Sequence, residues 1–484
     1  MKTIDFEHLF LAGWRPFAWI ALLVVLVYGQ TVRFGFVGYD DDALISNNET
    51  LAFSFENLIT AFSDDVMRDQ HGLFYRPVLS LSYMLDYAVA GKNPAVYHAA
   101  NLIYHLLAVY ALFALLLALG ARRAAAFLFS AVVAVHPVLV QAVAWLPGRN
   151  DLLLALFTIL AVLSFLRYMQ KSTTRRLILH GFWLLLALLT KETALIIPVL
   201  CLVAWYVLLR RDTAPRKLLP FLPAWVLVSA LWMALRMNAL GGSARPAHLT
   251  FFAPADLIAG WLSYLGKIFW PLHLQVFPVA GQLPVIEGVV VTLLLAGLAW
   301  RTRIPDRGQA LFGLLWFFLF LAPTIVRGTD DAAFLEHRIY LPMAGLAIAL
   351  NALRPWQGLS RTMVLAFFSA VLILFSVKTF THSGLFARDV TFWQAAVAGS
   401  PRSAFVYYGR ANAAMRHGDE SSAEFDYQKA LSLQPGFARA AYNLGNLYLK
   451  KGEYRKAAAA YRQVLRTVPQ HLDALINLSV AYRK

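Results

Sequence analysis

The sequence has few charged residues and a single cysteine, and each shortage excludes a class of protein. Charged residues make up 14% of the chain, whereas an ordinary soluble domain carries about 25%. Cys201 cannot form an internal disulfide and has no second cysteine for a zinc site. The nucleotide-binding pattern GxxxxGK[ST] is also missing. A disulfide scaffold, a zinc module, a P-loop enzyme and an ordinary soluble enzyme are therefore poor matches.

Hydrophobic residues, in contrast, are abundant: they make up 59% of the 484 residues. A membrane-spanning helix needs about 20 apolar residues in a row, and eleven runs reach or approach that length. They are 16–34, 96–120, 124–144, 150–167, 177–190, 193–209, 218–238, 285–300, 309–325, 339–353 and 362–381. We therefore predict an all-α, polytopic membrane helix bundle. No small-residue cleavage site follows the first run, so we expect a retained span and not a removed signal peptide.

Basic residues set the expected orientation of these spans. The chain has 43 Lys and Arg against 27 Asp and Glu, a formal charge of +16. The positive-inside rule explains this surplus better than a nucleic-acid partner does, and we expect no such partner. Basic clusters occur in alternate loops, at 122–123, 167–176, 210–217, 301–307 and 354–361. If these loops face the cytoplasm, the N-terminus is cytoplasmic, and eleven spans place the C-terminus outside.

Residues 256–276 are apolar enough to cross the membrane as well, but a crossing there would reverse every later loop. Lys267 lies in the middle of this segment, and Trp270-Pro271 interrupts it. We therefore expect a re-entrant or interfacial helix.

The last hundred residues have a different pattern from the rest. Proline recurs at intervals of 34, at Pro401, Pro435 and Pro469, and Trp393 and Tyr427 share the same interval. This period is the signature of tetratricopeptide repeats (TPRs). We predict a half-repeat at 386–399, full repeats at 402–435 and 436–469, and a last helix at 471–483. The chain then divides into a membrane domain, 1–383, and a short TPR solenoid, 384–484, which could bind a peptide on its concave surface.

The first outer loop, about 35–95, carries three adjacent carboxylates, Asp40, Asp41 and Asp42. Like charges beside a membrane cost free energy unless they have a function, although a solvated Asp-rich turn is an equally good interpretation. Tyr75 and Arg76 follow in the same loop, and Arg76 could pair with these carboxylates.

The next outer turn carries His136, Arg149 and Asp151. His136 is more simply explained as a buried ring bonded to backbone, and Arg149 with Asp151 as an ion pair at a helix start. The run 177–209 is too long for one crossing and must turn near Lys191 and Glu192, below the membrane surface.

Charges at that depth need a partner or a wet cavity, and a structural Lys191–Glu192 pair remains an alternative. The last outer loop adds Glu336, His337 and Arg338 just before a span. Anchoring at the membrane interface would explain Arg338, but it explains Glu336 and His337 less well.

Together these residues place carboxylates and cations on one outer face, which suits transfer of a group away from a phosphate. A carboxylate takes the proton of an incoming hydroxyl, and cations stabilise the departing phosphate. A lipid-linked phosphate is the natural donor because ATP is scarce outside the cytoplasm. The acidic triplet could hold Mg²⁺ or Mn²⁺, but we expect no metal or other cofactor. A TPR membrane scaffold for envelope assembly, or a lipid-linked sugar flippase, remain alternatives.

The ordered motifs FVGYDDD, FYRPVLSLSYMLDY, HPVLVQAVAWLPGRNDLL, LLTKET and EHRIYLPMAGL, ahead of TPRs, resemble the transmembrane-and-TPR O-mannosyltransferases and their bacterial relatives. The resemblance spans nearly the whole chain. It implies the type C glycosyltransferase (GT-C) fold, an extracytoplasmic active site and a polyprenyl-phosphate sugar donor. It also implies a hydroxyl acceptor on protein or glycan. From the acidic triplet and the short TPR tail we expect a bacterial inner membrane, with the TPR domain in the periplasm.

By the same resemblance, the paired acidic residues of the family fall on Asp40 and Asp41, one of which acts as the base, with Asp42 as an extra carboxylate. From charge alone we assign the donor phosphate to Arg149, Lys191, Arg338 and His337. The supporting or substrate-binding candidates are Asp42, Tyr75, Arg76, His136, Asp151, Glu192 and Glu336.

Overall fold

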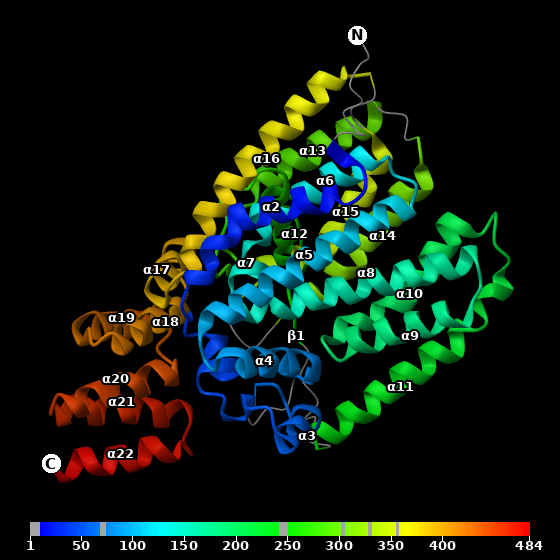
Figure 1. Ribbon diagram of the computed structural model, residues 1–484. Helices are drawn as coiled ribbons and strands as arrows, with labels where there is room; N and C mark the ends of the chain where they lie inside the picture. Colours follow the sequence, from blue (N-terminus) through cyan, green and yellow to red (C-terminus); the bar gives the residue numbers. More distant parts are fainter. Residues whose placement is uncertain (1–9, 68–73, 242–249, 302–304, 328–331, 355–357) are drawn as a thin grey trace.

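The computed structural model describes residues 10–67, 74–241, 250–301, 305–327, 332–354 and 358–484. This part of the chain is almost entirely helical (Figure 1). The helices before the TPR region are α2 (Arg15–Tyr28), α3 (Phe55–Ser63), α4 (Pro77–Ala90), α5 (Pro94–Ala118), α6 (Arg123–Ala134), α7 (Val140–Ala144), α8 (Arg149–Gln170), α9 (Thr174–Leu188), α10 (Ile197–Ala204), α11 (Phe221–Ala239), α12 (Pro254–Phe269), α13 (Ile286–Arg301), α14 (Arg307–Leu321), α15 (Tyr340–Leu353) and α16 (Arg361–Ser383).

Short elements join these helices. The 3₁₀ and π segments are η1 (Gly29–Arg33), η2 (Asp42–Ser46), η3 (Glu49–Leu51), η4 (Pro137–Leu139), η5 (Leu146–Gly148), η6 (Glu192–Ile196), η7 (Trp205–Leu209), η8 (Pro215–Leu218), η9 (Ala322–Ile325), η10 (Glu336–Ile339) and η11 (Gly384–Phe386). Strands β1 (Thr250–Phe251) and β2 (Val326–Arg327) form one antiparallel pair, with Phe251 opposite Val326.

Each of the eleven apolar runs coincides with a helix or a pair of helices. Within the described ranges, seven helical stretches are long and apolar enough to cross a membrane, and the bent pair of α6 with 137–144 makes an eighth. Helices α9, α13 and α15, which coincide with three further predicted spans, have 15, 16 and 14 residues. They are shorter than the about 20 residues of a full crossing. The seven or eight long apolar stretches nevertheless confirm a polytopic helix bundle.

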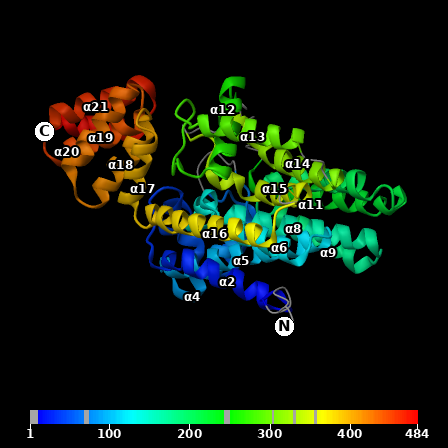
Figure 2. The same cartoon turned by 90° about the horizontal axis from the view of Figure 1, so that it is seen from above.

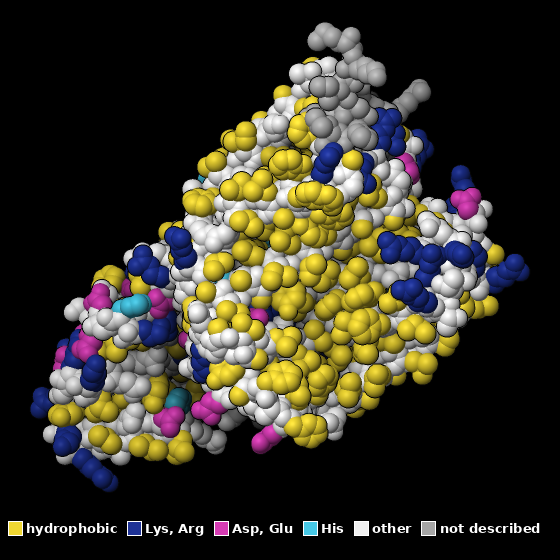
Figure 3. Space-filling view, viewed as in Figure 1, with side chains coloured by type: hydrophobic (Ala, Val, Ile, Leu, Met, Phe, Trp, Pro, Cys, Tyr) yellow, Lys and Arg dark blue, Asp and Glu magenta, His cyan; other side chains and the backbone are white. Residues whose placement is uncertain are grey.

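Burial separates the core of this bundle from its lipid-facing surface. In the span that contains α8, 83% of the residues are buried, whereas in the span that contains α16 only 11% are. Leu374 of α16 and Leu227 of α11 are among the most exposed large hydrophobic residues. Figure 3 shows hydrophobic side chains covering most of the visible bundle surface. Such a continuous apolar exterior is typical of a protein surrounded by lipid.

The basic loops gather at one end of the bundle. The Arg123 guanidinium donates to the Gly13 carbonyl at 2.6 Å, and Gln309 donates to the carbonyl of Leu119 at 2.7 Å. Lys217 likewise joins the carbonyl of Met169 at 2.7 Å. The first two bonds connect the N-terminal segment, the 122–123 cluster and the start of α14 beside the 301–307 cluster, and the third connects the 167–176 and 210–217 clusters. Residues 302–304 and 355–357 lie outside the described residues. Figure 3 shows the bundle's Lys and Arg gathered away from the TPR region.

Helix α12 runs along the connection between α14 and α15 and does not cross the bundle. Phe252, just before α12, donates its backbone N–H to Ile325 at the end of α14, and Lys267 near its C-terminus contacts Glu336 before α15. Because α14 and α15 are antiparallel neighbours, these two contacts lie at the same end of the bundle. This placement agrees with the predicted re-entrant or interfacial helix, and α12 ends at Trp270 as expected.

The TPR region follows α16 directly. Its helices are α17 (Asp389–Gly399), α18 (Ala404–Arg416), α19 (Glu420–Leu433), α20 (Ala438–Lys450), α21 (Tyr454–Thr467) and α22 (Leu472–Arg483). They match the predicted repeats within a few residues. A side chain at Gly409 would collide with the Trp393 ring, and one at Gly445 would collide with the Tyr461 ring, so glycine allows the close helix packing that the repeat pattern implies. Figure 2 shows this region as a separate lobe at the end of α16.

Candidate active site

The acidic triplet lies just after the first span, at the start of a short helical turn. Asp41 is completely buried, and its Oδ2 accepts a hydrogen bond from the Val37 N–H at 2.8 Å. Its Oδ1 has no hydrogen-bond partner among the described residues. Burial, with smaller contributions from the charges of Asp40 and Asp42, raises the pKa of Asp41 to about 7. A carboxyl with this pKa can accept a proton near neutral pH.

Aromatic rings connect the triplet with the last predicted site loop. Tyr39 stacks on Trp145 with centroids 5.8 Å apart, and Trp145 in turn lies 5.7 Å from the ring of His337. The segment between η1 and η2, the kinked segment before α8 and the turn before α15 therefore meet in one place. This convergence was predicted from the expected topology, but neither Tyr39 nor Trp145 was singled out in the sequence.

Positive charges surround His337. Burial first, and then the charges of Lys191, Arg338 and Arg76, lower the pKa of His337 well below its usual value. The lowered pKa favours the neutral form of the His337 ring. Its N–H groups contact Gln141: the backbone N–H donates to Gln141 Oε1 at 3.0 Å, and Nδ1 lies 3.2 Å from the same oxygen.

Lys191 and Glu192 lie at a break between helices, as predicted, but they do not pair with each other. Lys191 Nζ contacts Asp151 Oδ1 at 2.7 Å, and Glu192 Oε1 contacts Arg76 at 3.1 Å. The structure thus corrects two expected pairings, Arg76 with the acidic triplet and Arg149 with Asp151. Both observed pairs join segments that are far apart in the sequence, so no local pattern identified them.

Several atoms of these pairs still lack hydrogen-bond partners. Asp151 Oδ2, Glu192 Oε2 and Arg76 Nε are buried without one in the described part of the chain, and so is the hydroxyl of Tyr75. The guanidinium of half-buried Arg338 has no ion pair or hydrogen bond among the same residues. Buried polar atoms are normally hydrogen-bonded in native proteins. A cluster of unpaired ones indicates a place where a polar ligand completes the bonding.

Arg149 lies in a closed cluster and differs from these cations. It is completely buried and contacts Asp86 at 2.6 Å. Its guanidinium also donates to Asn101 at 2.7 Å, to Ser82 at 3.2 Å and to the carbonyl of Tyr97 at 2.8 Å. These contacts occupy the guanidinium, so Arg149 holds α4, α5 and α8 together and is not available to a phosphate in this structure. Asp86 is the only charged residue in the apolar stretch YMLDYAV, and this isolation could have indicated that it pairs with a buried cation such as Arg149.

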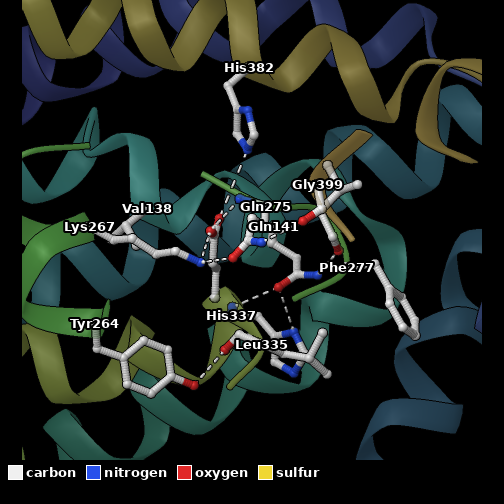
Figure 4. Close-up of polar contacts among 12 residues, drawn as sticks. Val138, Gln141, Tyr264, Lys267, Gln275, Phe277, Leu335, His337, His382 and Gly399 are labelled. Carbon is white, nitrogen blue, oxygen red and sulfur yellow. Dashed lines mark hydrogen bonds and ion pairs between the residues drawn. The ribbon is translucent and has the colours of Figure 1, made fainter. Parts of the chain in front are cut away.

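Glu336 belongs to a second buried network, shown in Figure 4. Its Oε1 contacts Lys267 Nζ at 2.8 Å and accepts the backbone N–H of Gln275 at 2.8 Å. Its Oε2 lies 3.9 Å from His382 Nε2. Figure 4 shows Lys267, Gln275 and His382 approaching from three different elements. Glu336 therefore fastens α12 and α16 to the turn before α15 and positions that turn.

His136 has the simpler of its two predicted roles. Its ring is buried, with Nε2 3.0 Å from the Ile268 carbonyl and Nδ1 accepting the N–H of Val138 at 3.3 Å. The ring thus bonds backbone on both sides and anchors the end of α12. Among the residues that the structure describes, no group of three or more His, Cys, Asp or Glu side chains is arranged to hold a metal.

Family models match a segment in each of the two parts of the chain. Residues 76–236 match the family model of dolichyl-phosphate-mannose-protein mannosyltransferase, and this segment holds Arg76 and the 136–192 candidates. Residues 408–471 and 442–484 match a tetratricopeptide repeat model, which confirms the predicted TPRs.

The sequence is also similar to curated proteins named protein O-mannosyl-transferases. The human TMTC1 protein is 26% identical over 507 aligned residues, covering 89% of this chain and 57% of the relative. The Drosophila melanogaster Tmtc1 protein is 35% identical over 199 residues, covering 40% of this chain and 23% of the relative. The chain therefore spans less than two thirds of the length of these relatives.

Among solved structures, this chain is similar to the crystal structure of ArnT from Cupriavidus metallidurans bound to undecaprenyl phosphate. The alignment covers 96% of this chain and 84% of the ArnT chain. The TM-score is 0.45 at 15% identity, a similarity too low to support an argument about mechanism. The sequence and family matches agree with the resemblance inferred from the motifs. The chain is therefore a multi-pass membrane protein with C-terminal tetratricopeptide repeats, similar over most of its length to the protein O-mannosyl-transferases.

Proposed function

We propose that the membrane domain, 1–383, is a glycosyltransferase of the GT-C type. It moves a sugar from a polyprenyl-phosphate donor to a hydroxyl of a protein or envelope glycan. The family model that matches 76–236 is named for dolichyl-phosphate-mannose and a protein acceptor, and the curated relatives are named for O-mannosyl transfer. These names support the substrate classes of the proposal.

The observation that carries the proposal is the set of buried polar atoms left without partners. Carboxylate oxygens, Asp151 Oδ2 and Glu192 Oε2, can accept hydrogen bonds from sugar hydroxyls. Arg76 Nε and the guanidinium of Arg338 can donate to a phosphate. A sugar phosphate has both kinds of group, so it matches this mixture of acceptors and donors better than a purely anionic or purely neutral ligand does.

In the proposed reaction, the acceptor oxygen attacks the anomeric carbon of the sugar. The bond between that carbon and the phosphate oxygen breaks, and the electron pair leaves with the polyprenyl phosphate. Asp41 takes the hydroxyl proton, because its free Oδ1 and raised pKa fit a general base. Direct displacement inverts the anomeric configuration. Arg338, together with Lys191 and Arg76, whose charges also act on His337, stabilises the charge on the departing phosphate without a metal ion.

We also propose that the basic end of the bundle faces the cytoplasm and that the TPR region, 384–484, lies in the periplasm of a bacterial cell. The support is the gathering of the basic loops at one end. A C-terminal tag should then be digested by protease added to intact spheroplasts, with a cytoplasmic protein as the protected control. A protected tag contradicts this orientation.

The test of the activity uses purified full-length protein in lipid nanodiscs with polyprenyl-phosphate sugars that carry a radiolabelled hexose. Hydroxyl-containing peptides and glycans serve as acceptors. We expect transfer by the wild type and by the Lys450→Ala control, and none by the Asp40→Asn/Asp41→Asn double variant. Absence of transfer from every donor, or full activity of a folded double variant, contradicts the proposal.

A further inference from the structure

The first two TPR helices contact the loop that carries the acidic triplet. Arg416, in the last turn of α18, forms the main link. Its Nε donates to Asp389 Oδ2 at 3.0 Å, its Nη1 lies 3.8 Å from Asp42 Oδ2, and its Nη2 donates to the carbonyl of Gly38 at 3.4 Å. One guanidinium thus joins α17, α18 and both ends of the segment 38–42.

The backbone at Gly38 is shaped for this contact. Its φ is +65°, a conformation that residues with side chains rarely adopt. A Cβ atom at this position would also collide with the guanidinium of Arg416. The turn therefore favours glycine, and a side chain at this position would displace the guanidinium of Arg416 from the segment.

Aromatic contacts hold the same segment independently of the charges. The ring of Tyr39 lies 5.8 Å from Trp393 of α17 and 5.9 Å from Phe405 of α18. Because Tyr39 also stacks on Trp145, it lies between the TPR helices and the membrane domain. The residue directly before the triplet is therefore packed on both sides.

A second contact ties the same TPR corner to the network around Glu336. Gln275 Nε2 donates to the carbonyl of Gly399 at 2.8 Å, and Ser400 Oγ donates to the carbonyl of Phe277 at 2.7 Å. Gln275 also donates its backbone N–H to Glu336. Figure 4 shows Gly399 beside Gln275. The α17–α18 corner thus touches both the triplet loop and the segment that fixes the turn before α15.

We propose that the α17–α18 pair is a built-in part of the transferase site and that Arg416 is a positioning residue for the acidic triplet. This inference rests on the proposed function. Arg416 bonds the triplet loop at Gly38 and Asp42, on either side of Asp41, so it fixes where the carboxylate of Asp41 points. The TPR region then has a task in catalysis besides any binding of acceptors.

The test compares Arg416→Ala, Arg416→Lys and the control Lys450→Ala in the full-length protein. Lys450 pairs with Glu420 on the TPR surface, its side chain is 67% exposed, and it does not contact the segment 38–42 in the described part of the chain. We expect kcat to fall about 10- to 100-fold in Arg416→Ala, since small misplacements of a reacting group have effects of this size. The donor KM should stay within about twofold of wild type, and Arg416→Lys should recover part of kcat because it keeps the charge.

Hydrogen exchange provides a readout that does not depend on activity. In Arg416→Ala, amides of residues 37–42 should exchange faster, while those of 404–484 keep their protection. A kcat within about twofold of wild type, unchanged exchange at 37–42, or loss of protection throughout 404–484 overturns the inference. If the wild type transfers no sugar, the proposed function fails, and the exchange of 37–42 alone decides whether Arg416 orders the loop.

Discussion

The membrane domain and the TPR region use charged residues in opposite ways. In the membrane domain, Arg76–Glu192, Lys191–Asp151 and Lys267–Glu336 join segments that lie 116, 40 and 69 residues apart. Five of these six side chains are at most 12% exposed, and that of Glu192 is 36% exposed. In the TPR region, Lys450–Glu420 and Lys456–Glu453 link neighbouring helices or turns on an exposed surface. The pairs in the first region connect distant segments around the candidate site, whereas these exposed TPR pairs connect neighbouring helices or turns.

The physical reason lies in the surroundings of each pair. An exposed ion pair contributes little because water solvates each charge almost as well as the partner does. When one partner of a buried ion pair is removed, the remaining charge cannot be solvated by water, so the substitution lowers the stability of the protein strongly. Substitutions in the two regions should therefore have effects of different size on stability and activity, and this difference can be measured.

The largest effect is expected where a buried carboxyl also reacts. Asp41→Asn should lower the transfer rate about 10²- to 10⁴-fold, because a general base contributes about this much. Donor-transfer assays with Asp40→Asn as the matched variant measure the effect. A larger loss in Asp40→Asn than in Asp41→Asn would move the role of base to Asp40.

Breaking the Arg149–Asp86 pair should give the largest loss of stability. Arg149→Leu should destabilise the protein by about 3–5 kcal/mol, because Asp86 is left as a buried, unpaired charge. The double variant Arg149→Leu/Asp86→Leu should regain much of this loss. Thermal unfolding in detergent compares the two, and equal losses in both variants would contradict the interpretation of Arg149 as a structural cation.

The raised pKa of Asp41 predicts a pH dependence. Activity should fall about tenfold per pH unit below about pH 7 as Asp41 becomes protonated. Stability should change in the opposite sense: the folded state binds this proton more tightly than the unfolded state, so its contribution is present in acid and is lost as the pH rises through about 7.

Asp41→Asn should therefore raise the Tm more at pH 8 than at pH 5. Thermal unfolding at the two pH values measures this difference. A Tm gain that does not depend on pH would show that Asp41 has an ordinary pKa.

The smallest effect is expected at Lys450. Lys450→Ala removes an exposed ion pair and should change neither the Tm nor the transfer rate measurably. A clear loss of stability would show that the TPR surface depends on its charges as the membrane domain does. A loss of transfer to peptides alone would instead place Lys450 in the acceptor site.

Most helices were predictable because their signals are local. The eleven apolar runs coincide with helices, the break at Lys191 follows from the length of its run, and the 34-residue period located every TPR helix. The predicted repeat 402–435, for example, contains α18 and α19. Such patterns depend on neighbouring residues along one chain segment, and they need no knowledge of what packs against it.

The partners within the site were less predictable. Arg76 was expected near the acidic triplet and pairs with Glu192, while Arg149 was expected at a phosphate and is enclosed by Asp86 and its neighbours. Asp86, Trp145 and Arg416 were not singled out, although Asp86 is a lone charge in an apolar helix. A charge signals that a partner must exist, but its spacing along the chain does not say which one.

Residue order alone was enough to identify a multi-pass bundle and a TPR tail, because hydrophobicity and repeat period are properties of short segments. The packing of distant helices decided which charges are enclosed, which keep free atoms for a ligand, and that α17 and α18 adjoin the triplet. Ion pairing in a low-dielectric interior depends on a few ångströms of separation in space, and those separations exist only after the chain has folded.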